Sequence, residues 1–383
     1  MEQQTAPMNE SNGNSGPLYM ALELSKSKWR LAFTVGLGQK PRERTLQVSE
    51  IDRLPDEIDR ARRRFGLAPD APVRSCHEAG RDGFWVHRWL VKNGIENVVI
   101  DSSSIQVDRR ARRAKSDGID VRELANLLFR HHNGEKKAFS VLCVPSPEDE
   151  DARHLHRDLK SLKQERTRLT NRIKSLLATQ RPDVEVLGPA ELLRLDVDKL
   201  PDWDGKPLLE GFKMRLSASL ARLELTHRQI LAAERARALA IRESDAPVWE
   251  LVRLLMTLKG IGENSAVVFV MEFFGWRKFQ NRRQVGALAG LAPTPFQSGK
   301  LCRELGITKA GNRLVRSVAV EIAWSWLRLQ PTSELSRWFA ERFAAGGPRA
   351  RKVGITAVAR KILILLWRYT ETGELPEGVE LKA

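Results

Sequence analysis

The sequence predicts an α/β domain followed by an all-α region, and three observations support this division. Short runs rich in β-branched and aromatic residues alternate with helical segments in the first third of the chain. Long segments with Leu spaced three or four residues apart come next, followed by a part richer in Gly and aromatic residues. We therefore expect a leader at 1–17, an α/β domain at 18–146, a helical hairpin or coiled coil at 147–245 and a helical C-terminal domain at 246–383.

The first 17 residues consist mostly of Asn, Ser, Gly, Gln, Pro and other polar types, so we expect them to form a disordered leader. The whole chain has 383 residues, of which 42% are hydrophobic, which is enough for more than one core. It contains no uninterrupted apolar stretch long enough to cross a bilayer, and its N-terminus lacks the pattern of a signal peptide. A membrane protein is therefore disfavoured.

The α/β domain begins with three short strand patterns, LYMALELS, WRLAFTV and RTLQVS, which predict a meander. A helix is predicted over residues 49–66. Then follow a strand in PVRSCHEAG, a helix in FWVHRWLVKNG, a strand in NVVIDSSS and a helix in GIDVRELANLLFRHHNG. Three strands followed by alternating helices and strands is the order of an RNase H-like fold.

The middle of the chain carries Leu at helical spacing in HLHRDLKSLKQERTRLTNRIKSLLATQ and in MRLSASLARLELTHRQILAAERARALA. These segments predict an antiparallel helical hairpin or coiled coil. The prolines and acidic residues at 181–207 predict a turn region between them. An arm for oligomerisation or RNA contact and a hairpin that packs only on itself are both compatible with this pattern.

The chain is strongly basic, with 64 Lys and Arg against 48 Asp and Glu and a net charge of +16. This charge favours a nucleic-acid partner over a membrane surface, because no membrane-spanning segment accompanies it. The three cysteines, Cys76, Cys143 and Cys302, lie far apart and suggest neither a zinc site nor a disulfide framework. We expect a protein of the reducing cytoplasm.

Four acidic residues stand where this fold can gather them. Glu23 lies in the first strand, Glu78 ends the fourth, and Asp117 and Asp120 open the following helix. Two acids three residues apart project from nearly the same helix face. Carboxylates in such an arrangement bind hard divalent cations, which stabilise the attacking and leaving oxygens of a phosphodiester exchange, so Mg²⁺ or Mn²⁺ is expected. Helix capping by the Asp pair and a solvent-exposed Glu78 are the structural alternatives.

A run of cations precedes the Asp pair. It places phosphate-binding potential beside the predicted metal site, although a solvated basic loop is an equally simple interpretation. Its members are Arg109, Arg110, Arg112, Arg113 and Lys115.

In the C-terminal part, LMTLKGIGENSAVVFVMEF predicts two helices joined by a turn that contains Lys259, Gly260 and Gly262. This pattern matches a helix-hairpin-helix element, whose turn presents backbone N–H groups to a phosphate. A tight connection between helices with no ligand is the alternative.

Ser298 lies in a Pro- and Gly-rich segment that predicts a loop ahead of a basic helix. A loop serine becomes a nucleophile toward phosphorus when a carboxylate–metal cluster or a cation such as Lys300 activates it. The commoner role of such a serine is to cap a turn. Lys309, Asn312 and Arg313 open the following helix and are candidates for contact with a DNA backbone, or simply mark a helix start after a glycine turn.

Taken together, these segments resemble the DEDD transposases of bacterial insertion sequences, the insertion-sequence one-ten family, from Leu18 onward. ALELSKSKW, CHEAG and KSDGIDVRELA are similar to the acid motifs of that family's RuvC-like domain. LKGIGENSA, GALAGLAPTPFQSG and GITKAGNRLVR are similar to its transposase domain. The resemblance implies metal binding by Glu23, Glu78, Asp117 and Asp120 and a nucleophilic Ser298. Glu23 departs from the family pattern, which has Asp there.

The resemblance also implies how the protein works and with which partners. Family members join donor and target DNA through a covalent serine–DNA intermediate, at a site shared between the RuvC-like domain of one subunit and the serine of another. This implies a homo-oligomer, a dimer or tetramer. A structured noncoding bridge RNA selects the DNA sequences by base pairing, and the basic charge suits both nucleic acids. A bacterial, cytoplasmic, nucleoid-associated protein is expected.

Three other functions are alternatives. A RuvC-like nuclease would hydrolyse DNA with metal-bound water and leave Ser298 structural. An architectural nucleic-acid binder would use the acids only as caps. A tyrosine recombinase is disfavoured because only Tyr19 and Tyr369 occur, and Tyr369 follows the apolar run ILILLWR.

Overall fold

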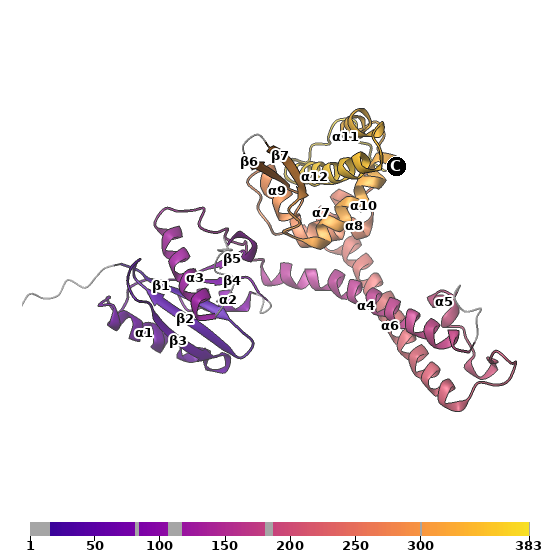
Figure 1. Cartoon of the computed structure of the whole chain (residues 1–383), viewed down its shortest axis with the longest axis horizontal. Helices are drawn as coiled ribbons and strands as arrows, with labels where there is room; N and C mark the ends of the chain where they lie inside the picture. The colour runs from indigo at the N-terminus through magenta and orange to yellow at the C-terminus, as the bar shows by residue number, and fades with distance from the viewer. Residues whose placement is uncertain (1–15, 81–83, 106–116, 181–186, 299–300, 383) are drawn as a thin grey trace, which may run out of the picture. The chain divides into compact units, whose positions relative to one another are not determined.

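The computed structural model describes residues 16–80, 84–105, 117–180, 187–298 and 301–382. The chain divides into two compact units, Met1–Val144 and Pro145–Ala383, and each is described by itself. Figure 1 shows the strands of the first unit and the helices of the second. The first unit is an α/β part and the second is mainly helical, which is the order that the sequence predicts. Most of the expected leader, residues 1–15, lies outside the described residues.

The first unit is built on a mixed five-stranded sheet with the order β3-β2-β1-β4-β5. Strands β1 (Leu18–Leu24), β2 (Lys28–Thr34) and β3 (Arg42–Gln47) form the predicted antiparallel meander. Strands β4 (Val73–Glu78) and β5 (Glu96–Ile100) run parallel to β1. The last strand is shorter than expected, because a 3-10 turn, η2 (Ser102–Ser104), replaces its predicted end.

Helices cover both faces of this sheet. The 3-10 turn η1 (Val48–Arg53), α1 (Leu54–Arg64) and α2 (Trp85–Lys92) lie on one face, where residues such as Leu54 and Leu90 pack against Leu22. Helix α3 (Asp117–His132) lies on the other face, where its Leu124 packs with Ala21. Because side chains alternate along a strand, the odd-numbered positions of β1 face α3.

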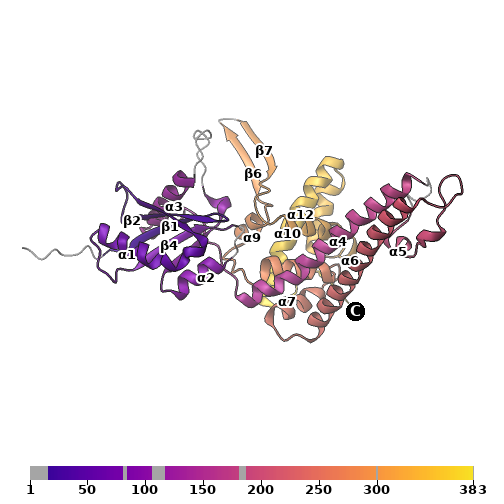
Figure 2. The same cartoon turned by 90° about the horizontal axis from the view of Figure 1, so that it is seen from below.

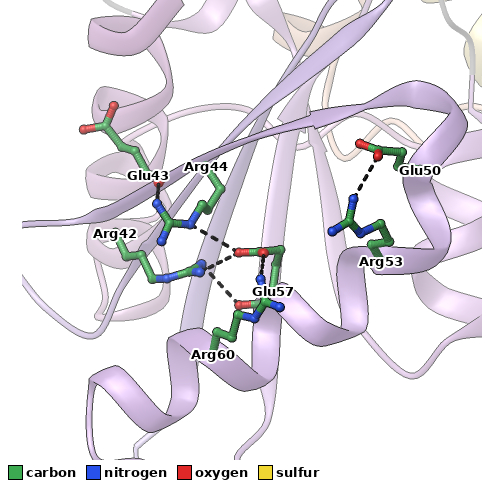
Figure 3. Close-up of polar contacts among 7 residues, drawn as sticks. All are labelled: Arg42, Glu43, Arg44, Glu50, Arg53, Glu57 and Arg60. Carbon is green, nitrogen blue, oxygen red and sulfur yellow. Dashed lines mark hydrogen bonds and ion pairs between the residues drawn. The ribbon is translucent and has the colours of Figure 1, made fainter.

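An ion-pair cluster ties the edge strand β3 to α1 (Figure 3). Arg42 is 4% exposed, and its Nη2 lies 2.5 Å from Oε2 of Glu57. Arg44 and Arg60 approach the same carboxylate to 3.5 and 2.7 Å. Burial alone would raise the pKa of Glu57, but the Arg42 hydrogen bond and the surrounding positive charges lower it below its usual value. The exposed strand edge is thereby fixed to the helix beside it.

The second unit begins with a helical hairpin, hereafter the arm. Helices α4 (Pro147–Ala178) and α6 (Glu210–Glu243) lie side by side, with Ile173 and Leu216 buried between them (Figure 1). The predicted turn region between them contains the short helix α5 (Pro189–Leu192) and the 3-10 turn η5 (Val197–Lys199). Lys163 and Glu234 form a 2.7 Å ion pair across the two helices.

The rest of the second unit packs around a core that includes Phe269, Trp326 and Ile362. No described helix is long and apolar enough to cross a bilayer. Along the chain the elements are α7 (Pro247–Met256), α8 (Glu263–Phe269), the π-helical turn η6 (Val270–Phe274), α9 (Arg282–Leu288), β6 (Pro293–Ser298), β7 (Leu301–Ile307), α10 (Arg313–Leu329), α11 (Glu334–Phe339), the π-helical turn η7 (Ala340–Ala344) and α12 (Pro348–Thr372).

The antiparallel hairpin of β6 and β7 corrects the sequence prediction of an irregular loop around Ser298. Two prolines in the first strand argue against a strand, because proline cannot donate to the hydrogen-bond ladder. Pro293 is tolerated as the first residue of its strand, and a register shift separates it from Pro295. Among the described residues the two strands pair only with each other, and Figure 2 shows them extending away from the helices of their unit.

Candidate active site

Two of the predicted acids lie next to each other at the ends of parallel strands. Leu22 of β1 is opposite His77 of β4, so Glu23 and Glu78 occupy the next position of each strand. Both lie on the face that α3 covers, because they alternate in phase with Ala21 and Cys76 of that face. Adjacent strands are about 4.8 Å apart, so the two half-buried carboxylates start from neighbouring backbone positions.

Helix α3 begins at this same edge of the sheet. Just after its end, Nδ2 of Asn133 lies 3.4 Å from the hydroxyl of Tyr19, near the start of β1. The carbonyl oxygen of Leu124, in the middle of α3, lies 3.7 Å from Sγ of Cys76 in β4. The helix therefore runs opposite to β1 and β4, with its first turns toward their carboxyl ends.

The spacing along the helix matches the spacing along the strands. Asp120 precedes Leu124 by one turn, about 6 Å of helix rise. Glu78 follows Cys76 by two residues, about 7 Å of strand. The backbone of Asp120 therefore comes level with Glu78, and Asp117 lies almost one turn further out. The side chains of Asp117 and Asp120 are outside the described part of the chain.

This edge of the sheet offers only oxygen donors from the predicted set, the ligand type that Mg²⁺ and Mn²⁺ prefer. Among the described side chains no three His, Cys, Asp or Glu groups gather as a metal site, but those of Asp117 and Asp120 are not among them. The four-acid metal site therefore stays a prediction. The basic run from Arg109 to Lys115 also lies outside the described residues.

Two polar residues at this edge were not selected from the sequence. Arg30 of β2 is paired with Glu23 and is exposed, so it adds a cation beside the acids. Asp101 directly follows β5, whose last residue is opposite Glu78. The position of Arg30 opposite Glu23 follows from the register of the β1–β2 pair, which the short connection between the two strands sets. Asp101 could have been predicted from the sequence, because it is an acidic residue directly after an apolar strand.

His77 lies on the opposite face of the strand end, beneath α2. It is 1% exposed, and burial together with the neighbouring His87 lowers its pKa to about 4. Its Nδ1 lies 3.5 Å from Nδ2 of Asn97, whose Oδ1 is 2.8 Å from Nδ1 of His87. A neutral imidazole is therefore held directly next to Glu78.

In the second unit, two glycines anchor the hairpin that carries Ser298. Gly290 and Gly311 have φ angles of +67° and +123°. A Cβ on Gly311 would lie 2.3 Å from the carbonyl oxygen of Leu288, and one on Gly290 would lie 2.6 Å from that of Ala310. This close approach joins the segments before and after the hairpin, and only glycine allows it.

Strand β6 leads from this anchor to Ser298, its last residue. The five steps from Pro293 to Ser298 span about 17 Å. The side chain of Ser298, and all of Lys300, lie outside the described residues. A nucleophilic Ser298 is therefore still a prediction, now placed at the far end of a strand.

Asn312 has a structural role that its predicted DNA contact did not include. Its Oδ1 accepts hydrogen bonds from the N–H groups of Leu314 and Val315 and so caps α10. Its Nδ2 lies 3.3 Å from Oε2 of Glu272. Lys309 and Arg313, in contrast, are exposed, and Lys309 has a left-handed φ of +57°.

Glu272 was not predicted from the sequence. It is 4% exposed and accepts hydrogen bonds from Nε and Nη2 of Arg157 at 2.7 and 2.8 Å, with Nε2 of His156 at 2.9 Å. Burial alone would raise its pKa, but these partners outweigh burial and hold the pKa far below the usual value. The carboxylate thus links the arm to the cap of α10. The sequence feature that could have indicated a buried carboxylate is an acidic residue within the apolar run VVFVMEFF.

The turn predicted to bind phosphate is bonded within the chain. Lys259 Nζ lies 2.7 Å from Oε2 of Glu380, and its backbone N–H donates to the carbonyl of the same residue. The N–H of Gly262 donates to Oγ of Ser265. Gly260 has a φ of +96°, as a tight turn requires. A phosphate at this turn would replace part of this bonding, and the predicted contact is untested.

Comparison with known sequences places these features in a class of proteins. The sequence profile of the transposase IS116/IS110/IS902 family matches residues 252–336, which include the turn at Lys259, β6 and β7. The chain is therefore similar, in the part that carries Ser298, to enzymes that move DNA.

Similarity to whole proteins extends the match over both units. A Sinorhizobium fredii protein named as a transposase, y4rJ, is 39% identical over 96% of this chain and 95% of its own length. A second one, y4qE, is 26% identical over 93% of this chain and 92% of its own. A Pseudomonas aeruginosa protein named as a family 20 transposase is 28% identical over 58% of this chain and 64% of its own. The chain belongs to the IS116/IS110/IS902 family of transposases.

Proposed function

We propose that this transposase exchanges DNA strands through a covalent serine–DNA intermediate at Ser298. In this proposal Glu23, Glu78, Asp117 and Asp120 hold Mg²⁺ or Mn²⁺ in an RNase H-like (RuvC-like) domain. The observation that carries the proposal is the adjacency of Glu23 and Glu78 at the strand ends, with α3 beginning at the same edge. A metal bound there would lower the pKa of a hydroxyl group and neutralise charge on the phosphate.

The proposed reaction conserves phosphodiester bonds. Oγ of Ser298 forms a bond to phosphorus and loses its proton, while the bond from phosphorus to one deoxyribose oxygen breaks and that oxygen gains a proton. In the second step, a deoxyribose hydroxyl of another strand attacks the phosphoserine and releases Ser298. Each step exchanges one phosphate ester for another, so no external energy source is required.

The described residues have defined roles in this proposal. Arg30 lies beside the acids and binds a phosphate, as do the exposed Lys309 and Arg313 near the hairpin anchor. The glycine contacts at Gly290 and Gly311 fix the start of the strand that presents Ser298. The turn at Lys259, in a helix-hairpin-helix role, binds the DNA backbone after Glu380 is displaced.

The choice of DNA sites, in this proposal, belongs to a structured bridge RNA. The net charge of +16 and the similarity of the motifs to bridge-RNA-guided transposases support this part. A site composed of the acids of one copy and Ser298 of another requires a dimer or tetramer. The protein would act in the bacterial cytoplasm, associated with the nucleoid.

The serine chemistry is tested with nicked suicide substrates that trap a covalent protein–DNA adduct. The expected result is an adduct with the natural chain and none with Ser298→Ala. Ser217→Ala, which changes an exposed serine of α6, is the matched control and should form the adduct normally. Full strand exchange by Ser298→Ala would refute the proposal. Cleavage without any adduct would favour hydrolysis by water.

The guide RNA is tested separately by purifying the protein with its bound nucleic acid and sequencing it. The proposal expects one defined, structured RNA in stoichiometric amount. A random mixture of cellular RNA would contradict the guided model while leaving the serine chemistry unaffected. A monomer in the presence of that RNA would contradict the shared site.

A further inference from the structure

A large basic groove in the second unit has, apart from Lys309 in its wall, no role in the function proposed above. Its volume is about 1600 Å³. Helix α12 forms one wall along most of its length, and the start of α9, the base of the β6–β7 hairpin, α11 and the segment 374–379 after α12 contribute the rest. All of these elements belong to one unit, so the groove is complete within it.

One entire face of α12 lines this groove. The lining residues recur every three or four positions from Arg349 to Thr372, the spacing of a single helix face. The nineteen helical steps from Arg349 to Arg368 span about 28 Å. Five members of this stripe are cations: Arg349, Lys352, Arg360, Lys361 and Arg368.

The opposite wall adds positive charge. Arg282 and Arg283 at the start of α9 and Lys309 beside the hairpin base also line the groove. Among the described residues, none of these eight cations has an ion-pair partner. Nε of Arg360 is buried and has no hydrogen-bond partner there either. A wall of unneutralised cations is complementary to a polyanion.

The acids that line the groove are few and do not neutralise it. They are Glu334, Glu374 and Glu377, of which the last two follow the end of α12. Glu377 forms an ion pair with Arg337, outside the groove lining. The basic part of the groove is therefore its section from Arg349 to Arg368.

Apolar surface lies between the cations. Val353 is 53% exposed, and Ile364 and Leu365 also line the groove. Trp338 of α11 lies among them, with Nζ of Lys361 at 4.4 Å from its ring centroid. A groove that combines cations with an aromatic ring and apolar side chains suits a single strand, whose phosphates and base faces are both accessible. A duplex exposes its phosphates but hides its base faces.

We propose that this groove binds a single DNA strand, with phosphates along α12 and bases toward Trp338. Strand β6 starts at the groove with Pro293 and ends at Ser298 about 17 Å away, so a bound strand continues toward the proposed nucleophile. The groove would hold a strand that has been separated from its complement during exchange. The choice of DNA as the polyanion rests on the proposed function.

The test measures binding of a fluorescent 20-nucleotide oligo-dT by anisotropy over a range of salt concentrations. It uses the full chain with Ser298→Ala and no divalent metal, so neither the serine chemistry nor the metal site is needed. The groove variant carries Arg349→Gln, Lys352→Gln and Arg368→Gln, three exposed cations of α12. The matched control removes the same charge from exposed cations outside the groove, with Lys278→Gln, Arg328→Gln and Arg342→Gln.

Loss of three phosphate contacts should reduce the slope of log K against log salt by about 2 and weaken binding on the order of 50-fold at ~0.15 M salt. The control should change the affinity by less than about threefold, a screened surface effect. Trp338→Ala should weaken single-strand binding by about tenfold through lost base stacking, and Trp338→Phe should retain most of it.

Several outcomes would overturn this inference. Equal losses in the groove variant and its control would show only general charge attraction. An equal loss for a 20-base-pair duplex would identify a duplex surface, and a loss confined to an RNA of the same sequence would identify an RNA surface. Normal single-strand binding with no serine adduct in the natural chain would instead count against the proposed function alone.

Discussion

The acids and the serine are held in very different ways. Glu23 and Glu78 stand on adjacent strands of a five-stranded sheet that helices cover on both faces, so many contacts fix their separation. Ser298 ends a strand that pairs with one neighbour only and is anchored at its base by Gly290 and Gly311. A two-stranded hairpin alone is marginally stable. The first arrangement gives the two acids a fixed separation, as the proposed metal site would require, and the second makes the placement of the serine depend on a few contacts.

The largest effect is expected from removing charge at the sheet edge. Glu78→Gln keeps the size of the side chain but removes its negative charge, and we expect DNA cleavage to fall on the order of 1000-fold, as when a key electrostatic group is lost. The measurement is single-turnover cleavage at varied Mg²⁺ concentration.

Glu96→Gln is the matched control, because it lies on the same sheet at the opposite end of β5 and is exposed. Its cleavage rate should stay within about twofold of the natural chain, because the ion pair that Glu96 forms with Arg74 is exposed, and such pairs contribute little. Similar rates in both variants would show that the strand-end acids have no catalytic role.

The second effect concerns the buried carboxylate that joins the arm to the rest of its unit. Glu272→Ala leaves His156 and Arg157 without their partner, and we expect a loss of about 3 kcal/mol, at the lower end for a buried pair because Arg157 is 44% exposed. Hydrogen exchange of peptides from α4 and α8 measures it. Glu234→Ala, which breaks the exposed pair with Lys163, should cost less than about 1 kcal/mol. Equal costs would mean that burial of the Glu272 cluster is unimportant.

The third effect is a difference between the two units in how their stability depends on pH. The pKa of His77 is lowered from 6.5 to about 4, so between these values the unfolded chain binds a proton that the folded chain does not. The stability of the first unit should therefore fall by up to about 3 kcal/mol as the pH drops through this window. Glu272 has a lowered carboxyl pKa, so its contribution is lost only as the pH falls below 4.5.

Hydrogen exchange of β4 peptides, corrected for intrinsic rates, measures this pH effect. His77→Gln should flatten the profile of the first unit above pH 4.5. His154→Gln, an exposed histidine of the second unit, should leave it unchanged. A flat profile in the natural chain would contradict the assigned burial of His77.

The smallest of these effects tests the glycine anchor. Gly311→Ala adds a Cβ that would lie 2.3 Å from a backbone oxygen, and we expect a cost of about 2 kcal/mol or more from strain and displacement. Gly306→Ala is a matched control, because its φ of +93° is also left-handed but nothing lies within 4 Å of the added Cβ. Local hydrogen exchange and adduct yield measure both. If the two variants behave alike, only backbone strain matters, and the contact with Leu288 does not.

Much of the first unit was predictable because its signals are local. Alternating and helical patterns predicted β1 to β5 and the helices between them, and an acid at a strand end predicted Glu78. The position of Arg30 opposite Glu23 was not predictable in the same way, because it depends on the register across the β1–β2 turn. Family resemblance, rather than periodicity, supplied the serine and metal roles.

The second unit was less predictable because its important contacts join distant segments. Pro293 and Pro295 concealed a strand that the partner strand β7 stabilises. Glu272 accepts a hydrogen bond from Arg157, which lies 115 residues away in the sequence, and no local sequence pattern indicates this contact. Asn312 was predicted to contact DNA, and the structure shows it as a cap, a role that its position before a helix also fits.

The bonds that close the second unit bear on the order of folding during synthesis. The first unit is complete once Leu142 has bonded to Val99. In the second unit, Arg157 can bond to Glu272 only after Glu272 has been synthesised. The carbonyls of Met256 and Ile261 accept hydrogen bonds from Nζ of Lys382, which is synthesised later still. At about 5–20 residues per second, the ribosome needs roughly 11–45 s to make the stretch from Arg157 to Lys382. A nascent chain therefore folds its acid-bearing unit well before the unit that presents the serine.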